Sequence, residues 1–175
     1  MVRNRFSSDD AESLRSKIFK LVNDADAPVA DVVRALAQCQ AHIQNRMIVE
    51  QTLKECGLRS TGFNANEYLE LYYDIAQGKR EVGYISKGWG DPGFRVGDVI
   101  EVSKWKIAAI KEHAYALLKY CATRGVVMTV EENDDDSVKL LMDSVIYSDG
   151  FNKKVFAQVL HYLNECTTKA EQLFG

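Results

Sequence analysis

Glycine is concentrated in one short part of the chain. Six of the eleven glycines fall within residues 78–97, together with one of the two prolines. Because glycine and proline are the residues that most weaken a helix interior, they exclude a helix from this part of the chain. Residues 82–86 and 94–102 have strand-like composition, and residues 89–93 between them have turn composition, so we predict a β-hairpin with a long tip. An extended, ordered loop is the alternative.

Helical periodicity surrounds the glycine-rich segment on both sides. Residues 11–21, 29–53, 107–121 and 156–173 carry apolar side chains mostly at steps of three and four, the spacing of one helix face. Residues 67–76 follow a capping sequence, and residues 138–145 follow an acidic run that suits a helix start, so both stretches also predict helices. Residues 126–130 are short and rich in β-branched side chains, and they predict a third strand.

One of these helices has a more specific pattern. Val29, Val32, Leu36, Cys39 and Ile43 follow the a/d spacing of a coiled coil. The helix would run from Pro28 to Gly57, roughly 40 Å at about 1.5 Å per residue. Packing inside a bundle is the preferred interpretation of this run, and a homodimer through the long helices is the alternative.

The expected fold is therefore mainly α (α+β). It is a bundle of about five helices with a short β-hairpin and a third strand. A chain of 175 residues predicts a single globular domain, residues 1–175, with the glycine-rich hairpin or loop 78–102 inserted between the helical halves. Hydrophobic residues make up 46% of the chain and aromatic residues 10%, which excludes a disordered protein.

Composition also bears on the cellular compartment. No stretch approaches the roughly 20 mainly apolar residues that cross a membrane, and no apolar segment follows the first arginines as in a secretory signal. The four cysteines, at positions 39, 56, 121 and 166, form no C-x-x-C pair and predict buried, reduced thiols. We expect a cytoplasmic protein that does not engage membranes.

Motifs of catalysis and metal binding are missing from the sequence. His42, His113 and His161 fall on three different predicted helices, without the Glu-x-x-His or His-x-x-x-His spacing of metal ligands. Neither a nucleophile elbow nor a phosphate-binding loop occurs. The sequence therefore predicts no catalytic residue, no metal and no cofactor, and it favours a protein that is not an enzyme.

Charge and aromatic side chains coincide in one segment. The chain has a formal net charge of −3, yet residues 78–106 hold six bases and four acids, a net charge of +2. Trp, Tyr and Arg dominate the binding energy of protein interfaces, so this segment is the candidate binding site. The predicted partner-binding residues are Tyr84, Lys87, Trp89, Phe94, Arg95 and Trp105.

The favoured function is that of a protein-interaction or regulatory protein, such as an adaptor, an immunity-like inhibitor or a chaperone. One alternative is nucleic-acid binding by the segment's bases, which its four acids disfavour. These bases are Lys79, Arg80, Lys87, Arg95, Lys104 and Lys106. Another is a small-ligand protein or enzyme with a pocket beside the loop, formed by Tyr84, Asp91, Asp98 and His113. A purely structural segment, with aromatics in the core and solvated bases, is the remaining interpretation.

Overall fold

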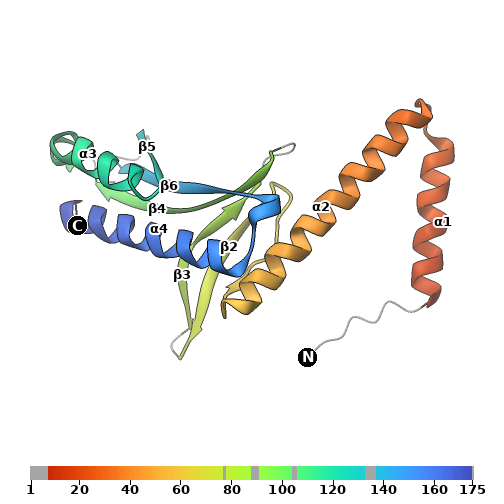
Figure 1. Ribbon diagram of the computed structural model, residues 1–175, viewed down its shortest axis with the longest axis horizontal. Helices are drawn as coiled ribbons and strands as arrows, with labels where there is room; N and C mark the ends of the chain where they lie inside the picture. Colours follow the sequence, from red (N-terminus) through yellow and green to blue (C-terminus); the bar gives the residue numbers. More distant parts are fainter. Residues whose placement is uncertain (1–7, 77, 88–90, 104–105, 133–136, 175) are drawn as a thin grey trace. The chain divides into compact units, whose positions relative to one another are not determined.

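The computed structural model describes residues 8–76, 78–87, 91–103, 106–132 and 137–174 (Figure 1). The chain divides into two compact units, Met1–Arg46 and Met47–Gly175. Helix α2, Val29–Glu55, passes through the boundary, so its first part belongs to one unit and its last part to the other.

The first unit is helical. It contains α1, Ser8–Asp24, and the first part of α2, and residues 25–28 join the two helices. The carbonyl of Pro28 accepts hydrogen bonds from the backbone N–H groups of Asp31 and Val32, at 2.9 and 3.2 Å, which starts α2 as the sequence predicts. Among the described side chains of residues 12–46 none is buried, so this unit has no core of its own.

The second unit contains a six-stranded antiparallel sheet. Its order is β1-β2-β3-β4-β6-β5, and every neighbouring pair is antiparallel. The strands are β1 (Arg59–Ser60), β2 (Tyr68–Ile75), β3 (Gly78–Ser86), β4 (Gly93–Ser103), β5 (Val127–Glu132) and β6 (Ser137–Tyr147). Two helices accompany them, α3 (Ile107–Ala122) and α4 (Lys153–Phe174), with a short 3₁₀ turn at Ser148–Gly150 before α4.

The expected helical bundle is therefore wrong. The described residues form four α-helices and a major antiparallel sheet, an α+β fold, where we expected about five helices and a short hairpin. The strands predicted at 82–86, 94–102 and 126–130 are present, but as parts of longer strands within this sheet. Helices are present at the four stretches with the clearest helical periodicity.

Two segments account for the error: residues 67–76, predicted as a helix, contain strand β2, and residues 138–145, also predicted as a helix, lie in strand β6. In β6 the buried side chains Val138, Leu140, Met142 and Ile146 lie at even steps, the period of a strand with one buried face. Leu69 and Leu71 of β2 are likewise both fully buried and two residues apart. Short apolar runs fit both periods, so pairing with distant strands decides between them.

The core lies on one face of the sheet. Helices α3 and α4 contact each other, and α4 packs along β4 and β6 (Figure 1). Val49 and Leu53, from the last turns of α2, are buried in the same cluster. Aromatic rings fill the end of this core near the start of α4, where Phe151 lies 5.0 Å from the ring centre of Phe94 and 5.4 Å from that of Phe156. The opposite face of the sheet carries none of these helices.

A glycine shapes that opposite face. Tyr84 of β3 lies opposite Gly97 of β4, and its ring crosses the space that a side chain at position 97 would fill. A Cβ atom there would come within 2.7 Å of the Tyr84 hydroxyl and 2.8 Å of the Met142 carbonyl oxygen. The tyrosine ring can therefore lie flat on the sheet only above glycine, where it also stacks on Tyr68 at 5.2 Å between ring centres.

We expect Gly97→Ala to lower the free energy of unfolding by about 1–3 kcal/mol, because overpacking forces side chains and backbone to shift. Urea denaturation of the purified chain measures this change. Gly150→Ala is the matched control, since no atom lies within 4 Å of the Cβ it would add. Equal stability of the two variants would show that Tyr84 does not pack on Gly97.

Candidate functional site

The predicted binding residues do not form one exposed cluster. Phe94 is 1% exposed and lies in the core beneath the helices, so it cannot contact a partner directly. Tyr84 lies on the opposite face of the sheet, largely covered, and Arg95 is exposed on that same face. Trp89 and Trp105 lie outside the described residues.

Lys87 is engaged by the protein itself. Its ammonium donates hydrogen bonds to the carbonyl of Asp91 at 2.7 Å and to the hydroxyl of Ser148 at 3.4 Å, and it lies 4.8 Å from the ring centre of Phe94. Burial lowers the pKa of this ammonium, which Asp91 and Glu67 partly oppose. Lys87 therefore ties the β3–β4 connection to the end of β6, and its role here is structural.

The open face of the sheet, opposite the helices, holds an ion pair. Both carboxylate oxygens of Asp143 on β6 accept hydrogen bonds from Nη1 of Arg95, at 3.2 and 3.1 Å. The Asp143 side chain is only 6% exposed, whereas that of Arg95 is 54% exposed. Burial, followed by the charge of Asp143, raises the pKa of the neighbouring Tyr84 to about 12. A carboxylate is thus held under an arginine and a protonated tyrosine.

Beside this ion pair the open face is apolar. Outward positions of β4, β6 and β5 carry an apolar patch of five residues, Val99, Val127, Leu141, Val145 and Tyr147. Val99 lies directly opposite Leu141 in the register, and Val145 lies opposite Arg95. All of the patch but Leu141 is clearly exposed. The open-face patch was not predicted from the sequence, because residues 138–145 were assigned to a helix. The alternation of polar and apolar residues at 137–140, Ser-Val-Lys-Leu, is the one local signal of a strand there.

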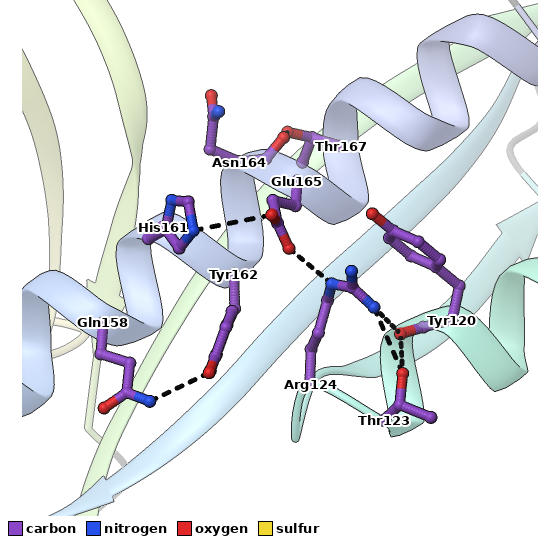
Figure 2. A network of polar contacts seen from close by, with 9 residues as sticks. All are labelled: Tyr120, Thr123, Arg124, Gln158, His161, Tyr162, Asn164, Glu165 and Thr167. Carbon is purple, nitrogen blue, oxygen red and sulfur yellow. Dashed lines mark hydrogen bonds and ion pairs between the residues drawn. The ribbon is translucent and has the colours of Figure 1, made fainter.

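A second polar arrangement ties α3 to α4 (Figure 2). Arg124 donates from Nε to Glu165 at 2.6 Å, and its guanidinium stacks 3.6 Å from the ring centre of Tyr120. Glu165 also lies 3.6 Å from Nε2 of His161. The hydrogen bond from Arg124 lowers the pKa of Glu165. Arg124, just after the end of α3, pairs with Glu165 of α4, so we assign this cluster to the packing of the two helices.

The cysteines are not uniformly buried as predicted. Cys121 and Cys166 are buried beside the Arg124 cluster, but Cys39 is exposed and Cys56 is partly exposed. A hydrogen bond between the two buried thiols lowers the pKa of Cys121 and raises that of Cys166. Cys39 lies in the first part of α2, where no described side chain is buried.

A polar groove opens on the helix side, where β3 separates from β4. Their pairing stops at Tyr84 and Gly97, and Gly83, with φ of 130°, allows β3 to leave the sheet. The groove has a volume of about 820 Å³ between β3, β4, α4 and the end of α2. Its charged lining contains four carboxylates, two bases and a histidine: Glu55, Glu81, Asp98, Glu171, Arg80, Lys153 and His161. Of the pocket residues expected from sequence, Asp98 alone lies in this lining.

Asp98 is one of the residues that line this groove. Burial raises the pKa of its carboxyl, and Glu171 and Glu81 add to the effect, while a hydrogen bond of 2.8 Å from the backbone N–H of Val99 opposes it. The described residues include no group of three or more His, Cys, Asp or Glu side chains placed to hold a metal ion. The groove is therefore an acidic, water-accessible surface without a metal-ligand set in those residues.

Comparison with known proteins gives information about the fold and none about the function. No protein-family model matches the chain, and no curated protein is similar to it in sequence. The structure is similar to the crystal structure of an uncharacterized protein from Methanothermobacter thermautotrophicus, with a TM-score of 0.53 and 15% identity over 75% of this chain and 99% of that one. YbjN, described as a putative transcription regulator from E. coli, matches with a TM-score of 0.48 and 14% identity over 70% and 90% of the two chains.

The first of these likenesses places most of the chain in the same α+β class, because it spans nearly the whole of the archaeal protein. Identities this low show a shared fold and carry no function. No helix in the described ranges is long and apolar enough to cross a membrane.

Tyr84 makes stability depend on pH in the alkaline range. The pKa of its phenol is about 12 in the folded chain against 10.0 in the unfolded chain, so the unfolded chain releases this proton first. The free energy of unfolding should therefore fall between pH 10 and about 12. We expect Tyr84→Phe to lose less stability over this interval, measured by urea denaturation at pH 9 and 11.5. Equal losses in both proteins would contradict a raised pKa at Tyr84.

For Asp98 we expect that removal of the carboxylate raises the free energy of unfolding at neutral pH. Because its pKa is raised above 3.8, the folded chain holds the proton more tightly, and stability falls as pH rises through the two values. Asp98→Asn should therefore be more stable than the natural chain at pH 7 and gain little near pH 3. Asn keeps the oxygen that accepts from Val99. Asp149→Asn, at an exposed carboxylate, controls for net charge, and a loss of stability at pH 7 would refute the argument.

Proposed function

We propose that this chain is a non-enzymatic protein-binding module and that the open face of the sheet is its binding surface. The observation that carries the proposal is the open-face patch on β4, β5 and β6, on the side that α3 and α4 leave uncovered. An antiparallel sheet with one solvated face normally places polar side chains there. Adjacent exposed apolar side chains on such a face are typical of interaction sites.

The surroundings of the patch fit an interface. Lys139 pairs with Glu101 at 3.5 Å at one end, and the Arg95–Asp143 pair lies within the patch, because Asp143 stands between Leu141 and Val145 along β6. Protein interfaces combine apolar side chains with a small number of polar groups that form hydrogen bonds. Tyr84 and Arg95 thus keep the partner-binding role expected from sequence, while Phe94 and Lys87 support the surface from behind.

Nucleic-acid binding has less support from the same geometry. Arg95 is paired with Asp143, and Lys87 is bound to backbone carbonyls. Lys106 donates to the carbonyl of Phe174 beyond the other end of β4, so it lies roughly 30 Å from Lys87 at about 3.3 Å per strand residue. With Lys87 and Lys106 this far apart and Arg95 paired between them, these three bases do not form the continuous positive surface that phosphate binding requires. Lys104 lies outside the described residues.

A small-ligand site in the polar groove is the second candidate, favoured by the groove's volume of about 820 Å³. Its acidic lining would select a cationic ligand. A protein partner is the better supported because the apolar patch supplies binding energy from burial, whereas the groove is polar and open to water. A regulatory or adaptor role in the cytoplasm is the corresponding cellular function.

The test compares two valines on opposite faces of the sheet. Val145 in the patch is 48% exposed and Val130 on the helix side of β5 is 44% exposed, so their substitution by aspartate changes exposed surface to a similar extent. A partner is first isolated on the natural chain from the source cells and purified. We expect Val145→Asp to weaken its binding at least tenfold and Val130→Asp to leave it near the natural value, measured by calorimetry.

Equal affinities of the two variants would contradict the proposal. A partner that proves to be an oligonucleotide, with binding that falls steeply as salt is raised, would establish the nucleic-acid alternative instead. Circular dichroism of both variants controls for folding.

A further inference from the structure

We propose that Cys121 and Cys166 are a redox pair, which hydrogen peroxide converts into a disulfide that clamps α3 to α4. Cys121 lies in the last turn of α3 and Cys166 in the second half of α4, and both are free thiols in this structure. Both belong to the second compact unit. The proposal goes beyond the protein-binding function and does not involve the open face.

The two thiols meet between the helices. Both side chains are 0% exposed and belong to the core cluster that α3 and α4 share. A hydrogen bond joins the two thiol groups. Sulfur atoms in contact on two facing helices have only a short approach to make to the S–S bond length of about 2.05 Å.

An ion pair holds the helices together at the same point (Figure 2). Arg124, three residues after Cys121, donates from Nε to Glu165 at 2.6 Å, and Glu165 directly precedes Cys166. The guanidinium of Arg124 is stacked on Tyr120, 3.6 Å from the ring centre. These contacts keep the two backbone segments that carry the cysteines close together without help from the thiols.

The surroundings give the two thiols different chemical roles. The hydrogen bond from the Cys166 thiol lowers the pKa of Cys121, burial opposes this effect, and the charge of Arg124 adds to it. The hydrogen bond to Cys121, burial and the charge of Cys121 raise the pKa of Cys166. Because the thiolate is the nucleophile, Cys121 attacks the peroxide and Cys166 is the resolving cysteine.

The reaction reduces the peroxide to water. The Cys121 sulfur attacks one peroxide oxygen and the O–O bond breaks, and the released hydroxide takes the thiol proton to give water and a sulfenic acid. The Cys166 sulfur then attacks the Cys121 sulfur, the S–O bond breaks, and the hydroxyl leaves as a second water with the Cys166 proton. Two electrons pass from the sulfurs to the peroxide. Because the sulfenic acid is neutral, the charge that raised the pKa of Cys166 is gone before this second step.

The peroxide reaches Cys121 through the end of α3. Helix ends open locally at a much lower free energy than the core of a protein. Cys121 is one residue from the end of the helix at Ala122, and Gly125, with φ of 68°, turns the chain toward β5. Opening of this one turn exposes the Cys121 sulfur while the sheet stays folded.

The experiment first removes the two cysteines outside the pair. Cys39→Ser and Cys56→Ser together leave Cys121 and Cys166 as the only thiols of the full chain. After peroxide treatment we expect the mass of this double variant to fall by about 2 Da, the two hydrogens lost, with tryptic peptides joined through positions 121 and 166. The midpoint of urea denaturation should rise by roughly 1 M and return on reduction with dithiothreitol, because a cross-link restricts the unfolded chain.

Further serine substitutions in the double variant test the two roles. Cys166→Ser keeps a hydroxyl that donates to Cys121. It should form a dimedone adduct of the Cys121 sulfenic acid at least tenfold faster than Cys121→Ser forms one at Cys166. Circular dichroism shows whether both proteins are folded, and the disulfide measurement on the double variant stands without them.

Three results would overturn the proposal. The first is a peroxide-treated double variant that keeps both thiols open to alkylation or carries added oxygen alone. The second is a disulfide that joins separate chains or lowers the urea midpoint. The third is faster adduct formation at Cys166 than at Cys121.

Discussion

The pairing of β4 with β6 is the interaction on which the second unit depends. The two strands match along eleven residues, from Gly93 opposite Tyr147 to Ser103 opposite Ser137. This register places Phe94, Val96 and Val102 on the side of α4, and it places Arg95, Gly97 and Val99 on the other side. Because successive strand residues point to opposite faces, one register fixes both the core and the open face.

The sheet has an open face because the helices of the second unit pack on one side only. Helices α3, α4 and the last turns of α2 cover one side of the sheet. The first part of α2 and all of α1 belong to the other compact unit. A sheet with a single covered face can remain apolar on the other only if something binds there, or the chain accepts a cost in solubility. The Arg95–Asp143 pair and the Tyr84 ring give this face a defined shape.

The amphipathic helices were predictable because a 3.6-residue period extends over many turns and needs no information about distant residues. Strands β3, β4 and β5 were also predictable in part, since glycine, proline and β-branched residues act locally. Strands β2 and β6 were not, because Leu69 and Leu71 or Leu141 and Val145 fit a helix equally well until a neighbouring strand pairs with them. The same ambiguity between helix and strand limited the prediction of the site residues. Tyr84 and Arg95 were found by residue type, but three of the five apolar residues beside them, Leu141, Val145 and Tyr147, belong to the misassigned β6.

The most direct measurement of the central claim is photo-crosslinking in the living source cells. A photo-reactive phenylalanine analogue replaces Tyr147, which is 61% exposed on the open face, or Tyr115, which is 78% exposed on α3. If the open face binds a protein, position 147 should yield a discrete adduct with another protein, and position 115 should not. Adducts of the same protein at both positions, or an adduct at position 115 alone, would contradict the account.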